Sequence, residues 1–120
     1  MTHHLFFLAG FAFLLAHEMD AIRCREWKIF PILGGMGEET GYVAFTALHV
    51  PLYALLFWGL VVGGASGRLI TGLDAFFVVH LILHIVLRNH PENRFGSRFS
   101  RALFVGAGVC GAIDLLIGSP

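Results

Sequence analysis

The sequence predicts an all-α integral membrane protein, built as a bundle of four membrane-spanning helices. Hydrophobic residues make up 57% of the 120-residue chain and charged residues only 13%, about half the roughly 25% that is usual in soluble domains. The apolar residues gather in four runs that approach the roughly 20 residues needed to cross a bilayer. Turn-forming residues separate these runs. A chain of this length has room for one domain, so we expect residues 1–120 to form a single transmembrane domain.

The first two spans differ in how they carry polar residues. The first is expected at about residues 2–22, where a short apolar run ends in His-Glu-Met-Asp at residues 17–20. It lacks the basic start and the cleavage site of a signal peptide, so we interpret it as a retained helix. The second span, at about residues 42–63, is apolar apart from Thr46 and His49.

The last two spans complete an even number of crossings. The third is expected at about residues 69–87 and the fourth at about residues 102–117. The two cysteines, Cys24 and Cys110, fall on different segments at different expected depths, and no CxxC pair is present. We therefore expect neither a disulfide nor a zinc ribbon.

Basic residues predict the orientation of the chain in the membrane. Seven of the eight lie after the first span or around the connection between the third and fourth spans, namely Arg23, Arg25, Lys28, Arg88, Arg94, Arg98 and Arg101. Only Arg68 lies on the opposite side. The positive-inside rule then places both termini on the non-cytoplasmic side. The formal net charge of zero leaves no basic surface for nucleic acid.

Ionisable residues from three spans fall at one expected depth. Counted from the cytoplasmic ends at about 1.5 Å per residue, they lie within a layer about two helical turns thick. Charged side chains are costly inside a bilayer, about 3 kcal/mol each, so their concentration needs a cause. A bound metal ion is the first candidate, and its candidate ligands are His17, Asp20, His49, His80 and His84.

Helical spacing supports a shared site. His80 and His84 are four residues apart on one face, the spacing with which a helix offers two nitrogen ligands to one ion. His17 and Asp20 are three residues apart and also share a face. Glu18 projects about 100° from His17, so we assign it the catalytic role of moving protons rather than binding the ion. The alternative is that Arg23 and Arg25 simply neutralise the nearby carboxylates.

This set of ligands favours a catalytic metal site. Histidines with one carboxylate suit Zn²⁺ or Fe²⁺, and a catalytic ion held by three protein ligands keeps a position for water. The sequence thus predicts a membrane-embedded metalloenzyme that acts on a lipid or another apolar substrate reaching the site from the bilayer. A dinuclear iron site would need Glu18 and Asp20 besides four histidines, and the chain has only His-x-x-Asp where such bundles carry Glu-x-x-His.

Two alternatives from other functional classes remain open. In the first, histidines from two spans are axial ligands of a haem in an electron carrier, and Arg88 meets a propionate. In the second, the chain is a non-catalytic accessory subunit or small transporter, whose polar layer mediates helix contacts or proton movement. In each case the lipid bilayer is a partner, and three arrangements stay open: a bundle that is complete alone, a homo-oligomer, or a subunit of a larger membrane complex.

The sequence His17-Glu18-Met19-Asp20-Ala21 resembles the signature of small bacterial four-span membrane proteins known for a His-x-x-Glu-Glu motif. Asp20 stands at the position of the first Glu and Ala21 at that of the second, so only one of the two carboxylates is retained. The resemblance covers this motif, the later membrane histidines and the four-span layout. It implies a location in the bacterial inner (plasma) membrane and an enzyme whose reaction is unknown.

Overall fold

In the computed structural model, helices are the only regular secondary structure among the residues that it describes, which are 4–30, 33–64 and 66–117. It has four long helices, α1 (Leu5–Arg23), α2 (Glu38–Phe57), α3 (Gly67–Val86) and α4 (Arg98–Ile117). Two short 3₁₀ helices, η1 (Glu26–Ile29) and η2 (Leu33–Gly35), lie between α1 and α2, and α2 continues as a π-helical segment, η3 (Trp58–Val62). The all-α prediction is therefore confirmed.

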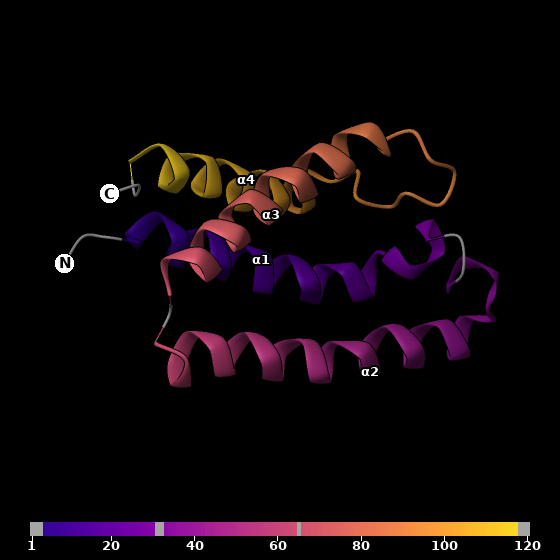
Figure 1. Ribbon diagram of the computed structural model, residues 1–120. Coiled ribbons are helices and arrows are strands. Elements are labelled where there is room, and N and C mark those ends of the chain that lie inside the picture. The colour runs from indigo at the N-terminus through magenta and orange to yellow at the C-terminus, as the bar shows by residue number, and fades with distance from the viewer. Residues whose placement is uncertain (1–3, 31–32, 65, 118–120) are drawn as a thin grey trace.

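The long helices run alternately up and down. Figure 1 shows that α1 begins and α4 ends at one end of the molecule, whereas the α1–α2 and α3–α4 connections lie at the other end. Each long helix, with α2 taken together with η3, is long and apolar enough to cross a membrane. This confirms the prediction of a four-helix bundle with four candidate spans. Which end faces the cytoplasm remains a prediction from the basic residues.

Helix α4 packs against both α1 and α3, and small residues on it allow the close approach. A Cβ atom at Gly111 would lie 2.8 Å from the backbone carbonyl oxygen of Asp74 in α3. One at the facing Gly10 of α1 would lie 3.1 Å from Cβ of Cys110. Close contact between helices through small residues is typical of membrane bundles. The apolar core between these helices contains Phe7, Phe11, Leu14, Ile70, Phe77 and Ala107.

Helix α2 packs much less closely than the other three. Only Gly41 and Phe45 of its residues are buried, and both lie near Trp27 of η1. In Figure 1, α2 runs alongside α1, on the side away from α4. The interior of the bundle is therefore formed mainly by α1, α3 and α4, and the buried polar residues lie there.

Candidate metal centre

Three histidines and one glutamate converge inside the bundle. Each offers one ligand atom, and the four atoms lie within 4.8 Å of one another. The residues are His17 of α1, Glu26 of η1, and His80 and His84 of α3, with exposed fractions of 0%, 8%, 8% and 7%. The structure thus brings together three of the five candidate ligands named from the sequence, and adds Glu26.

The three imidazole rings contact one another edge to face. The His80 and His84 rings, one turn apart on α3, have centroids 4.6 Å apart. The His17 ring crosses from α1, with its centroid 4.7 Å from that of His80 and 4.8 Å from that of His84. The i, i+4 spacing on α3 therefore places both rings on the face that meets α1.

A sharp turn of the backbone brings Glu26 back to this cluster. Arg25 adopts a left-handed conformation with φ of 52°, which is uncommon for a residue other than glycine. The turn separates α1 from η1, so Glu26 points back to the helix end that the chain has just left. Its Oε2 lies 3.5 Å from Nε2 of His17, and its Oε1 lies 3.8 Å from Nε2 of His84.

Among the described residues, several buried polar atoms of the cluster have no hydrogen-bond partner. They are Nδ1 and Nε2 of His17, Oε2 of Glu26 and Nδ1 of His80. Most buried polar side-chain atoms in proteins do have a partner, so these four atoms need an explanation. Burial raises the pKa of Glu26, but its interactions with His17, His84 and His80 lower that pKa by more, so it lies below its ordinary value. Glu26 is therefore an ionised carboxylate at neutral pH.

Aromatic rings cover one side of the cluster and a small cavity adjoins another. Phe104 of α4 stacks on the His84 ring at 4.3 Å, and Phe95 from the α3–α4 connection meets the same ring at 4.8 Å. The cavity has a volume of about 70 Å³ and is lined in part by Glu26, His80 and His84. It is large enough for one or two water molecules.

Asp20, named from the sequence as a ligand, lies outside this group. Its Oδ1 accepts a hydrogen bond from Nε of Arg23 at 3.0 Å, and its Oδ2 is 3.7 Å from Sγ of Cys24. Arg23 also donates through Nη2 to Oγ of Ser100, at 3.1 Å. Asp20 thus positions Arg23, which joins the end of α1 to the beginning of α4.

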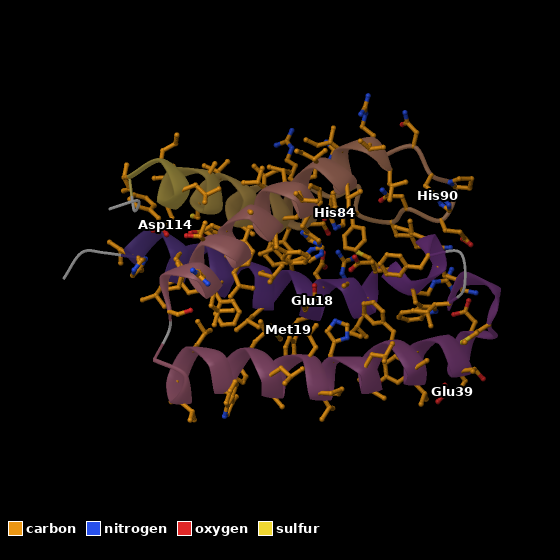
Figure 2. All side chains as sticks on the ribbon, in the orientation of Figure 1. Glu18, Met19, Glu39, His84, His90 and Asp114 are labelled. Carbon is orange, nitrogen blue, oxygen red and sulfur yellow. The ribbon has the colours of Figure 1, made fainter. Side chains whose placement is uncertain are left out.

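His49 and Glu18 form a separate pair between α1 and α2. Nε2 of His49 lies 2.5 Å from Oε2 of Glu18, and its Nδ1 lies 2.6 Å from the carbonyl oxygen of Phe45. A carbonyl oxygen only accepts, so Nδ1 is the donor in the contact with Phe45, and the other ring nitrogen meets the Glu18 carboxyl group. Figure 2 shows Glu18 on the side of α1 that faces α2, with His84 on the side toward α3. The pair of Glu18 and His49 is therefore separated by α1 from the metal cluster.

Glu26 was missed in the sequence because helical spacing stops at the end of α1. It lies between Arg25 and Lys28 in a basic connection, where a single carboxylate is most simply a solvated charge. The one available signal is that Glu26 is the only acidic residue in the basic segment 23–28. That signal singles out the residue but does not indicate which way its side chain points.

Comparisons with known proteins place the chain in a family without giving it an activity. No curated protein and no solved structure matches the sequence. The sequence model of one protein family, described as a family of unknown function (DUF6713), matches residues 3–119. Because the match spans nearly the whole chain, this protein belongs to the DUF6713 family.

Proposed function

We propose that this protein is a membrane-embedded metalloenzyme that holds Zn²⁺ or Fe²⁺ and acts on a lipid or another apolar substrate. The proposed ligands are His17, Glu26, His80 and His84. The observation that carries the proposal is the convergence of four buried residues that each offer a ligand atom. Three of these residues have side-chain atoms without a hydrogen-bond partner in the described part of the chain. A bound cation would engage one such atom from each of these three residues.

The chemistry and geometry of the donors fit such an ion. Imidazole nitrogens with one carboxylate oxygen suit Zn²⁺ and Fe²⁺ better than Ca²⁺ or Cu(I). Ligand distances of about 2.0–2.1 Å in a tetrahedral site put the donor atoms about 3.4 Å apart. The donors now lie within 4.8 Å of one another, so small side-chain rotations would complete the site.

A catalytic role is supported by the cavity beside the cluster. The volume of about 70 Å³ next to Glu26, His80 and His84 leaves room for water or part of a substrate. When bound, the metal ion would polarise that molecule as a Lewis acid. Phe95 and Phe104 pack against His84 and cover part of its ring. Glu18 takes no ligand role in this proposal, because His49 engages its carboxyl group.

The ring packing favours a single ion over haem. The three imidazole rings already contact one another at centroid distances of 4.6–4.8 Å, and Phe104 stacks on His84. A macrocycle with two of these histidines as axial ligands would have to separate the rings and displace that phenylalanine. An absorption spectrum distinguishes the two cases, since only haem gives a Soret band.

Elemental analysis of protein purified in mild detergent without chelators tests the proposal. We expect about one Zn or Fe per chain, and loss of that metal in the His80→Ala and His84→Ala variants. His49→Gln is the matched control, because it removes an imidazole at the predicted depth but outside the cluster. A wild-type protein that retains no ion after loading with Zn²⁺ or Fe²⁺ would refute the proposal and favour the non-catalytic subunit or transporter. Equal metal loss in His49→Gln would refute the ligand assignment.

A further inference from the structure

A second cavity lies against the metal cluster, at the α3–α4 connection. Its volume is about 340 Å³, within the range of small-molecule sites. Residues 88–101 around it contain four arginines and one glutamate, so the local charge is strongly positive. The cavity is lined by His84, Ile85, Arg88, Asn93, Phe95, Gly96, Arg101, Phe104 and Val105.

The walls of this cavity are amphipathic. Arg88 and Arg101 supply guanidinium groups, and no carboxylate is among the lining residues. Phe104 supplies an apolar surface, while Ile85 and Val105 are 49% and 40% exposed. In a membrane-spanning bundle, apolar side chains exposed on the outer surface of α3 and α4 contact lipid. The cavity therefore has a positive side and a side open to acyl chains.

Both guanidinium groups keep N–H donors that can bind a ligand. Arg88 uses Nη1 to donate to the carbonyl oxygen of Ile85 at 2.8 Å, which fixes its stem along the end of α3. Within the described part of the chain, Arg101 has neither a hydrogen bond nor an ion pair to another side chain. Planar guanidinium groups bind carboxylate and phosphate oxygens through paired, charge-assisted hydrogen bonds.

Side-chain hydrogen bonds shape the connection that closes the cavity. Asn93 donates from Nδ2 to the carbonyl oxygen of Leu87 at 2.8 Å and accepts from the backbone nitrogen of Phe95 at 2.9 Å. Oγ of Ser97 accepts from the backbone nitrogen of Ser100 at 3.0 Å, capping the start of α4. Each of these bonds holds Phe95 or the first turn of α4 in position beside the arginines.

We propose that this cavity binds the anionic oxyacid headgroup of a lipid, with Arg88 and Arg101 as the headgroup ligands and the acyl chain leaving past Ile85 and Val105. This inference rests on the proposed metalloenzyme, because His84 belongs to both the cavity lining and the metal cluster. The headgroup site would anchor the substrate beside the cluster. The substrate class of the enzyme is then an anionic amphiphile.

Native mass spectrometry of the detergent-purified full chain tests this proposal, with phosphatidylglycerol, phosphatidylcholine and inorganic phosphate as separate probes. We expect one phosphatidylglycerol per chain, bound at least tenfold more tightly than either other probe. Arg88→Gln with Arg101→Gln should weaken phosphatidylglycerol binding at least tenfold. The control, Arg94→Gln with Arg98→Gln, removes the same charge from the same connection but no lining residue, and should change binding less than threefold.

The outcomes separate the two proposals. Equal losses of phosphatidylglycerol affinity in both double variants would overturn the assignment of the headgroup site to this cavity, because they would show general attraction to a basic surface. If inorganic phosphate bound as tightly as phosphatidylglycerol, the claim that the ligand is an amphiphile would be overturned. If the double variant fails to fold, Arg101→Gln alone replaces it: this change removes a side chain that has no side-chain partner among the described residues, and it should lower the affinity for phosphatidylglycerol. Metal analysis of the same samples tests the metal site separately, since a metal-free wild type with arginine-dependent lipid binding contradicts only the proposed function.

Discussion

Replacing Glu26 by glutamine should weaken metal binding by about two orders of magnitude. The substitution keeps the size of the side chain and removes the one anionic donor in the cluster of Glu26 with His17, His80 and His84. Structural zinc sites with four ligands bind with about 10–16 kcal/mol, or about 3 kcal/mol per ligand. Since about 1.4 kcal/mol corresponds to a factor of ten, losing one ligand corresponds to about a hundredfold.

Asp20→Asn provides the matched control, because it removes the carboxylate that helical spacing alone had placed in the site. Asp20 is 6% exposed, but its oxygens face Arg23 and Cys24. We expect its variant to bind metal within about threefold of the wild type. The assay is competition for Zn²⁺ with a chromophoric chelator at pH 7, on protein whose helix content by circular dichroism matches the wild type.

Two results would contradict this reasoning. Unchanged affinity in Glu26→Gln would mean that the carboxylate near His17 does not ligate the ion. A hundredfold loss in Asp20→Asn would mean that Asp20 ligates the ion, and that the end of α1 rearranges when the metal binds. Either result leaves the three histidines to be tested by the alanine variants.

Three further results are expected. Gly111→Ala should destabilise the protein in thermal unfolding by about 1–3 kcal/mol, because its Cβ would meet the carbonyl oxygen of Asp74; Gly72→Ala, where a Cβ meets nothing within 4 Å, should not. Native Cys24 should resist maleimide at pH 7 and react after denaturation, since it is 1% exposed and burial raises its pKa, which leaves little reactive thiolate; rapid native labelling would be inconsistent with this burial. Chelation should lower the unfolding midpoint of the metal-loaded wild type, by the equivalent of about 2.7 kcal/mol when free metal had been at 100 times Kd, and should leave His80→Ala unchanged.

The helices and part of the site could be predicted because both depend on regular spacing. Apolar runs long enough to cross a bilayer predict α1 to α4 directly. The four-residue spacing of His80 and His84 predicts a shared face, and counting depth from the helix ends brings His17 to the same level. The structure shows these three histidines together.

The remaining positions depend on information that spacing does not contain. Depth places His49 at the level of the other histidines, but it does not say which neighbour α2 faces, and His49 meets Glu18 on the far side of α1. The three-residue spacing puts Asp20 and His17 on the same side of α1 but does not direct both side chains to one point. The Asp20 carboxylate accepts a hydrogen bond from Arg23 instead. Glu26 follows a left-handed residue, so the periodicity of α1 cannot be continued to it.

The order of the ligands along the chain links the cluster to the way the protein is made. His17 and Glu26 precede α2, whereas His80 and His84 follow it. During synthesis, the donor set is therefore incomplete until α3 has emerged and reached α1. The stacking ring of Phe104 arrives later still, with α4. An ion held by all four residues would join the first and third helices, which α2 separates only in the sequence, so its retention would mark a chain in which α3 has reached α1.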